Sequence, residues 1–196
     1  MNKVGEIKKY TALNWQYEGF GMPFWWLSKA EELKHSADIL WRDIATEGNA
    51  FLELCEKIKK GGKIITQPRR PSVMNSFLLI SGLSLENLFK GIILIEYPEF
   101  VKDGKLRGKT ITSHDLIHLA KEAKIQLSND EKNLCELASE SIIHLGRYPI
   151  PKNKGESLGF MRIIYTIKEV YDAFFLRLSN EIPLRLKTLS GTATTI

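Results

Sequence analysis

Two charged side chains stand one helical turn apart in the most apolar stretch of the chain. Glu86 and Lys90 are four residues apart within residues 72–96, a spacing that places both on one face of a helix. A charge in such a segment must find a partner or reach a cleft, because an uncompensated buried charge costs several kcal/mol. The pair therefore serves either as an internal polar latch or as part of a ligand site.

Four further residues have the chemistry to contact a phosphate or a base. Asp115 is expected in the first turn of a short helix, where a carboxylate complements the exposed amides, and His114 beside it can donate to a carbonyl or a phosphate. Arg147 offers a planar fork for carboxylate or phosphate, and Tyr148 offers a ring for stacking. The alternative is that Arg147 or Lys90 pairs with Glu86 and only holds the helices in register.

Common catalytic and metal-binding signatures are missing from the sequence. We find no GxGxxG, Walker lysine loop, HExxH or GxSxG pattern. Glu32 and His35 have the Glu-x-x-His spacing found in each half of a di-iron site, but no other expected helix contains a second copy of it. His114 and His118 could share a metal ion, but the sequence offers no third ligand for it. We therefore predict no metal and no cofactor.

Basic residues are concentrated in two segments. The chain has 28 lysines and arginines against 23 acids, a formal charge of +5. Residues 102–109 carry four basic residues and one acid, Asp103. Residues 57–71 carry six basic residues and no acid: Lys57, Lys59, Lys60, Lys63, Arg69 and Arg70. These segments are either solvated loops or surfaces that contact a polyanion.

The elements that position these residues are predicted to be helices. A chain of 196 residues is one domain's worth, and its apolar residues recur at steps of three and four, with almost no strand-like alternation. Expected helices cover residues 23–44, 50–58, 72–96, 113–123, 128–146 and 158–178. Ser72, Ser113 and Ser128 are the expected N-caps, and Pro183 the expected stop. The predicted class is all-α, an antiparallel bundle of four to six helices.

The expected domain organisation is one bundle with two appended segments. Residues 1–22 form an aromatic-rich N-terminal arm that acts as a lid or dimer seam, residues 23–182 form the bundle, and residues 183–196 form a flexible tail. No apolar stretch reaches the length of a spanning helix, and residues 1–10 lack the apolar block of a secretory signal. We therefore expect a cytoplasmic protein without membrane contact. Cys55 and Cys135 are expected to be buried thiols.

Three segments resemble the HEPN family of helical, nucleotide-binding or RNase-like domains. These are Gly82-Leu83-Ser84-Leu85-Glu86-Asn87-Leu88-Phe89-Lys90-Gly91, Ser113-His114-Asp115-Leu116-Ile117-His118-Leu119 and Gly146-Arg147-Tyr148-Pro149. Their order and helical context agree with the family over residues 72–180. The resemblance implies a helical bundle that forms a homodimer and binds nucleotide or RNA. It also implies a role in a toxin–antitoxin or defence pair with a nucleotidyltransferase-like partner.

The family pattern for RNA cleavage is incomplete in this chain. Many HEPN proteins resemble metal-independent ribonucleases that use an arginine and a histidine separated by four to six residues. No such histidine follows Arg147, whereas Arg107 and His114 match with six residues between them, a spacing expected by chance in a chain of this composition. We therefore favour a non-catalytic member of the family. A ribonuclease that uses Arg107 and His114 and a protein-interaction module without ligand stay open as alternatives.

Overall fold

The computed structural model describes residues 22–60, 73–102, 105–145 and 166–191. Five α-helices make up most of this part of the chain: α2 (Pro23–Lys59), α3 (Met74–Glu96), α4 (Leu116–Glu122), α5 (Asn129–Glu140) and α6 (Ile167–Gly191). A 3-10 turn (η2, Pro98–Phe100) and a two-stranded hairpin connect α3 to α4, and a π-helical turn (η3, Ser141–Leu145) extends α5. The predicted all-α class is confirmed.

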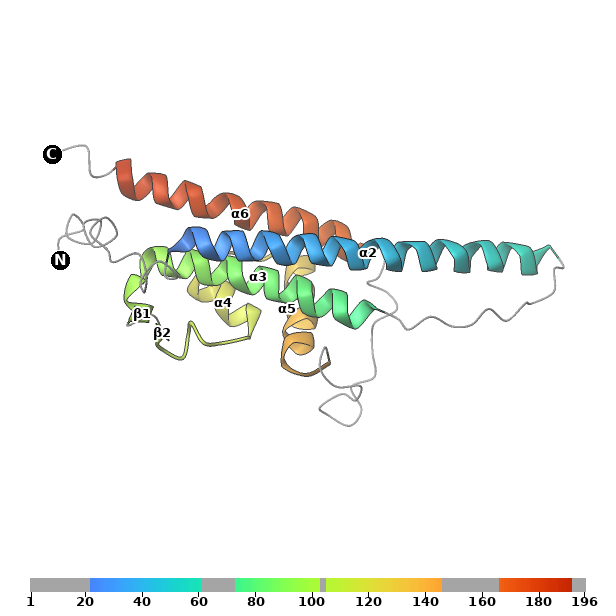
Figure 1. Ribbon diagram of the computed structural model, residues 1–196, viewed down its shortest axis with the longest axis horizontal. Helices are drawn as coiled ribbons and strands as arrows, with labels where there is room; N and C mark the ends of the chain where they lie inside the picture. Colours follow the sequence, from blue (N-terminus) through green and yellow to red (C-terminus); the bar gives the residue numbers. More distant parts are fainter. Residues whose placement is uncertain (1–21, 61–72, 103–104, 146–165, 192–196) are drawn as a thin grey trace.

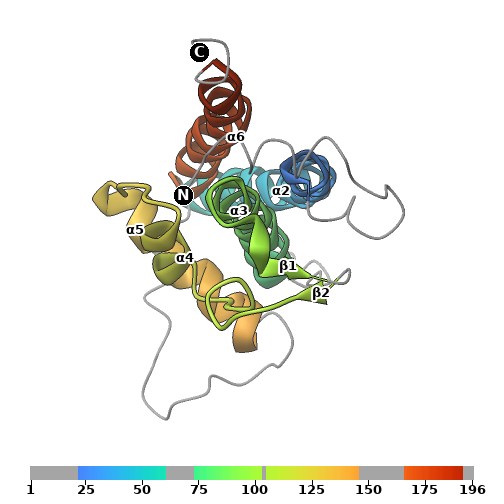
Figure 2. The same cartoon turned by 90° about the vertical axis from the view of Figure 1, so that its left-hand side faces the viewer.

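Helix α3 is the centre of the bundle. Figure 2 shows it with α2 and α6 on one side and α4 and α5 on the other. In Figure 1, α2 runs antiparallel to both α3 and α6, while α5 crosses α3 at a steep angle. The crossing is close, because a Cβ added at Gly82 of α3 would lie 3.0 Å from Ala138 Cβ of α5. A glycine at this position therefore lets the two helices approach.

The core explains why α3 is apolar on nearly every side. Leu85, Leu88, Phe89 and Ile92 are fully buried against the surrounding helices, as expected of a helix enclosed by others. By length and composition alone α3 could cross a membrane, and it is the one helix of the described residues that could. Because 78% of its most apolar window is buried inside the bundle, this is weak evidence for a membrane span.

Two predicted helix boundaries are wrong. The segments 23–44 and 50–58 form one continuous helix, α2, because the cost of Gly48 in a helix interior, about 1 kcal/mol, is too small to end it. Pro183 lies inside α6 rather than at its end, so residues 183–191 of the expected tail are helical. Buried Ile182 and the ion pairs of Arg185 with Glu96 and Glu181 hold the chain in place around this proline.

The helix caps are predicted in part. Ser128 forms the expected capping box with Glu131 at the start of α5. By contrast, α3 begins after Val73 rather than Ser72, and α4 is capped by Asp115 rather than Ser113. The strands β1 (Val101–Lys102) and β2 (Lys105–Leu106), which pair antiparallel, were not predicted because each is two residues long.

Candidate functional site

The charged pair in α3 is buried and closed on itself. Lys90 Nζ donates to Glu86 Oε1 at 2.7 Å, and the two side chains are only 5% and 7% exposed. Both lie on the side of α3 that faces the segment before α4, because the second carboxylate oxygen of Glu86 reaches His114 there. The predicted pairing of Lys90 with Glu86 is confirmed. Attraction and desolvation are both large at such burial, so neither charge can be removed alone without a penalty.

His114 connects this buried pair to the surface. Its Nδ1 lies 2.9 Å from Glu86 Oε2, and its side chain remains 50% exposed. Because the carboxylate can only accept, Nδ1 carries the hydrogen, which leaves Nε2 as an acceptor on the neutral ring and a donor on the charged ring. Glu86 therefore fixes both the tautomer and the orientation of an imidazole that a ligand can reach.

The backbone around His114 is held on both sides. Asp115 accepts hydrogen bonds from the amides of Ile117 and His118 at 2.9 and 3.1 Å, so its carboxylate is the N-cap of α4. The amide of Leu116 donates to Ser139 Oγ of α5 at 2.9 Å. Sequence reasoning missed Ser139, whose only signal is a small polar residue next to the apolar stripe of α5. Asp115 acts structurally here, since its carboxylate is used by the helix start.

A basic surface precedes His114 in the chain. The hairpin and the turn that follows it carry four exposed basic residues, Lys102, Lys105, Arg107 and Lys109, which we call the hairpin surface. The amide of Arg107 donates to the carbonyl of Phe100 at 2.7 Å, which ties the turn to η2. Gly108 has a φ of +110°, a conformation that favours glycine. This geometry explains why a glycine follows Arg107 in the chain.

The other predicted site residues are dispersed. Lys57, Lys59 and Lys60 are exposed at the far end of α2, away from α4 in Figure 1. Five predicted site residues lie outside the described part of the chain: Lys63, Arg69, Arg70, Arg147 and Tyr148. The pairing of Arg147 with Glu86 and the roles given to the other four residues therefore stay predictions.

Metal-ligating side chains do not gather in the described residues. No group of three or more His, Cys, Asp or Glu residues there is arranged to hold a metal ion. Glu32 and His35 are both exposed on α2. Cys135 is buried, and burial raises the pKa of its thiol to about 12, whereas Cys55 is half-buried, contrary to the prediction. A thiol with such a raised pKa is a poor nucleophile at neutral pH.

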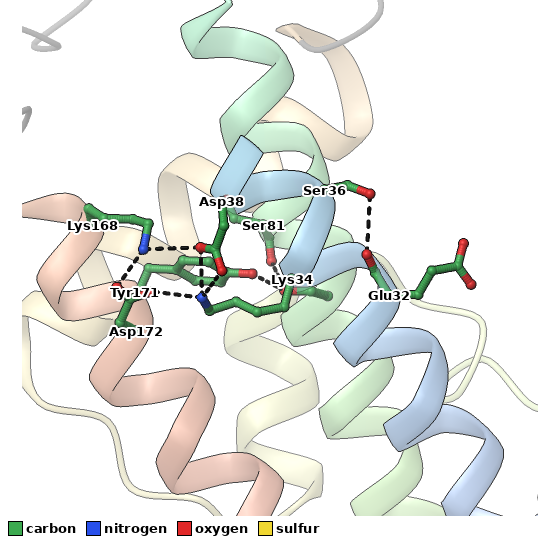
Figure 3. A network of polar contacts seen from close by, with 9 residues as sticks. Glu32, Lys34, Ser36, Asp38, Ser81, Lys168, Tyr171 and Asp172 are labelled. Carbon is green, nitrogen blue, oxygen red and sulfur yellow. Dashed lines mark hydrogen bonds and ion pairs between the residues drawn. The ribbon is translucent and has the colours of Figure 1, made fainter. Parts of the chain in front are cut away.

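A second polar cluster, which sequence reasoning missed, joins α2 to α6 (Figure 3). Lys34 Nζ lies 2.7 Å from Asp38 Oδ2 and 2.9 Å from Asp172 Oδ1, and Lys168 Nζ lies 3.0 Å from Asp38 Oδ1 and also pairs with Asp172. Each lysine thus contacts both aspartates. The available signal was the i, i+4 spacing of Lys34 with Asp38 and of Lys168 with Asp172. We call these four residues the α2–α6 clamp.

The electrostatics of the α2–α6 clamp favour its charged form. Burial by itself raises the pKa of Asp38, but hydrogen bonds from Lys34 and Lys168 outweigh it, and the net pKa is lowered from 3.8. Burial likewise opposes the charge of Lys34, but its bonds to Asp38 and Asp172 raise its pKa above 10.5. Because every charge is balanced within the cluster, the clamp is a structural tie rather than a site for a charged ligand.

The buried end of the clamp reaches α3 through a tyrosine. Lys34 Nζ lies 5.3 Å from the centre of the Tyr171 ring, and the Tyr171 hydroxyl shares a 2.7 Å hydrogen bond with Ser84 Oγ. Burial raises the pKa of Tyr171 well above its usual value. Ser84 in turn donates to the carbonyl of Ser81 at 2.7 Å. All polar atoms along this path are satisfied, which is typical of a structural network.

Comparison with known proteins does not identify this bundle. No family model, curated protein or solved structure matches the chain. The fold and site described above define an all-α helical bundle with a buried Glu–Lys pair that orients an exposed histidine.

Proposed function

We propose that the chain is a HEPN-like helical domain that binds RNA or a nucleotide through its phosphates. The observation that carries the proposal is the contact of half-exposed His114 with buried Glu86, which is itself paired with buried Lys90. This arrangement presents a pre-oriented ring that follows an exposed basic segment in the chain. It also joins, in three dimensions, two of the three segments that resemble the family.

The hairpin surface supplies the charge for such binding. Lys102, Lys105, Arg107 and Lys109 are exposed within a dozen residues of His114. Contact with three or four phosphates of a single strand predicts that log K falls with log salt concentration with a slope of about −2 to −3. The resemblance further suggests a homodimer and a nucleotidyltransferase-like partner, which belong to the same proposal.

Binding of labelled single-stranded RNA and of nucleoside triphosphates, measured by anisotropy and by calorimetry, tests this proposal. We expect Lys102→Glu/Lys105→Glu/Lys109→Glu to weaken binding at least tenfold. The matched control is Lys57→Glu/Lys59→Glu/Lys60→Glu, which makes the same charge change at the far end of α2 and is expected to change binding less than threefold. Undetectable RNA and nucleotide binding by the wild type at low salt would exclude the function.

Cleavage of RNA is the second candidate, because Glu86 fixes the tautomer of His114. His114 Nε2 would accept the proton of a 2′-hydroxyl, whose oxygen attacks the adjacent phosphorus to form a 2′,3′-cyclic phosphate. The bond to the 5′ oxygen breaks, and this oxygen takes a proton from water and leaves as a hydroxyl. Arg107, seven residues before His114 in the chain, would compensate the charge that develops on the phosphate. Cleavage in EDTA that is lost in His114→Ala and kept in His35→Ala, an exposed histidine of α2, would support this activity. No cleavage by the wild type would leave binding as the function.

A further inference from the structure

The exposed nitrogen of His114 has a different hydrogen-bonding role in each charge state of the ring. Nδ1 lies 2.9 Å from Glu86 Oε2 and carries a hydrogen. In the neutral ring Nε2 then has no hydrogen and can only accept, whereas in the charged ring Nε2 donates. A phosphodiester of RNA is negatively charged, and its free oxygens only accept. The charged ring can therefore donate to a phosphate through Nε2, and the neutral ring cannot.

The contact with Glu86 removes the other way for this histidine to donate to a phosphate. A neutral imidazole can carry its hydrogen on either ring nitrogen, and the form with the hydrogen on Nε2 donates without an added proton. In this structure that form would place two acceptors, Nδ1 and the carboxylate of Glu86, against each other. Glu86 is buried and is also held by Lys90 at 2.7 Å, so it cannot turn away cheaply. A phosphate contact at Nε2 therefore requires a second proton on the ring.

The elements around His114 carry one other group of the type that changes its charge near neutral pH. Imidazole is the side chain that ordinarily does so between pH 5 and 8, and the second imidazole here is His118, half-buried in α4. The remaining charged side chains on these elements are carboxylates, ammonium groups and a guanidinium: Glu86 and Lys90 on α3, Arg107 and Lys109 in the preceding turn, Asp115 at the N-cap of α4, and Glu136 and Glu140, which flank Ser139 in α5. A change in binding across this pH range therefore points to His114 or His118.

The charge balance of the buried pair makes the site depend on this proton. Glu86 and Lys90 carry opposite charges in contact with each other, so they cancel. The ring of His114 therefore adds no charge to this cluster when it is neutral and one positive charge when it is protonated. A phosphate beside Nε2 favours the protonated ring, because an opposite charge nearby stabilises the charged form. By thermodynamic linkage, the proton favours phosphate binding to the same extent.

We infer that the phosphate ligand binds together with a proton, which His114 takes from the solvent and holds on Nε2. The inference rests on the proposed function and adds its regulation by pH. Since the bound form holds a proton that the free ring loses as the pH rises, affinity falls with rising pH. No covalent bond changes in this step. Cleavage with His114 as the base needs the neutral ring and is expected to have the opposite pH dependence.

Calorimetry with an oligouridylate that has hydroxyl groups at both ends tests the inference. Neither its internal phosphates nor its uracil rings change charge between about pH 5.5 and 8, where imidazole does. At constant ionic strength we expect the dissociation constant of the wild type to rise at least about tenfold across this range, as for the loss of one hydrogen bond to a charged group. Titrations at the same pH in two buffers of different ionisation enthalpy should show a net uptake of protons on binding.

Two glutamine variants assign the proton to one ring. A glutamine amide donates hydrogen bonds without titrating, so His114→Gln should bind with a dissociation constant that changes by less than about threefold over the same range and without proton uptake. His118→Gln removes the other nearby imidazole and is the matched control, which should keep the pH dependence of the wild type. Circular dichroism checks that both variants keep wild-type helicity.

The outcomes separate this inference from the function on which it rests. Wild-type binding that is equally tight at both ends of the pH range, or that tightens as the pH rises, overturns the inference and leaves the proposed function standing. A pH dependence that persists in His114→Gln and disappears in His118→Gln also overturns it. If His114→Gln folds but does not bind, the wild type decides, and binding without proton uptake overturns the inference. A wild type that does not bind the oligonucleotide at any pH overturns the inference, and the proposed function falls with it if nucleoside triphosphates do not bind either.

Discussion

Replacing Glu86 with glutamine should destabilise the fold strongly by leaving a buried lysine without its counterion. Lys90 is 4% exposed, and its ammonium donates to Glu86 Oε1 at 2.7 Å. Breaking a buried ion pair by removing one partner costs about 3–5 kcal/mol, because the remaining charge is desolvated and uncompensated. His114 is half exposed and can recover hydrogen bonds with water, so its lost contact adds little. We expect a loss of about 3 kcal/mol in the free energy of unfolding.

Urea unfolding followed by circular dichroism measures this loss. For a chain of this size, about 3 kcal/mol corresponds to a fall in Tm of roughly 6–12 °C. The matched control is the double variant Glu86→Gln/Lys90→Met, which removes both charges and should be more stable than Glu86→Gln alone. Such a recovery is the signature of an uncompensated buried charge.

Two results would refute this reasoning. A Glu86→Gln variant within 1 kcal/mol of the wild type would mean that Lys90 reaches water and that the pair is not desolvated. A double variant less stable than Glu86→Gln would mean that the lysine contributes through packing of its stem rather than through its charge. RNA binding by the double variant then separates the roles of the pair, because a pure latch leaves binding unchanged whereas an orienting role weakens it.

Three further predictions follow from single contacts. Gly82→Val should lower the free energy of unfolding by about 1–3 kcal/mol, because the larger side chain overpacks against α5. Gly48→Ala, at a position with no neighbouring atom, should raise it by about 0.5–1 kcal/mol. Thermal unfolding of both variants and the wild type measures the two changes. Asp115→Ala should lose about 1 kcal/mol of N-cap stabilisation that Asp115→Asn retains. Because folding lowers the pKa of Asp38, its contribution is present above pH 3.8 and disappears as the pH falls through the lowered value. Urea midpoints of Asp38→Asn and wild type should therefore differ at neutral pH and converge in acid.

The helices were predictable because their signals are local and redundant. The capping box of Ser128 and Glu131 specifies the start of α5 by two reciprocal hydrogen bonds, and the apolar periodicity of residues 72–96 specifies a central helix. The errors occurred where tertiary contacts outweigh a single residue. Pro183 is a strong stop signal in isolation, yet buried Ile182 and the ion pairs of Arg185 hold the helix around it.

The candidate site was predictable in its parts but not in its connection. The i, i+4 spacing of Glu86 and Lys90 predicts their pairing, since both residues are on one helix. The contact of Glu86 with His114 spans 28 residues, and no local pattern encodes such a distance. The same limit applies to the α2–α6 clamp. Each i, i+4 pair within one helix could be predicted from its spacing, but the contacts between the lysine of one helix and the aspartate of the other could not.

The two charged clusters differ in one respect that decides which of them suits a ligand. In the α2–α6 clamp each aspartate contacts both lysines. An anion that binds there would have to displace an aspartate, which would lose its contacts with both lysines. In the Glu86 cluster the carboxylate is already shared by Lys90 and His114, and His114 keeps half of its surface in water. A ligand phosphate can add to this exposed edge without breaking the buried pair. Of the two clusters, His114 is therefore the one that suits the proposed phosphate ligand, whereas the clamp holds the helices together.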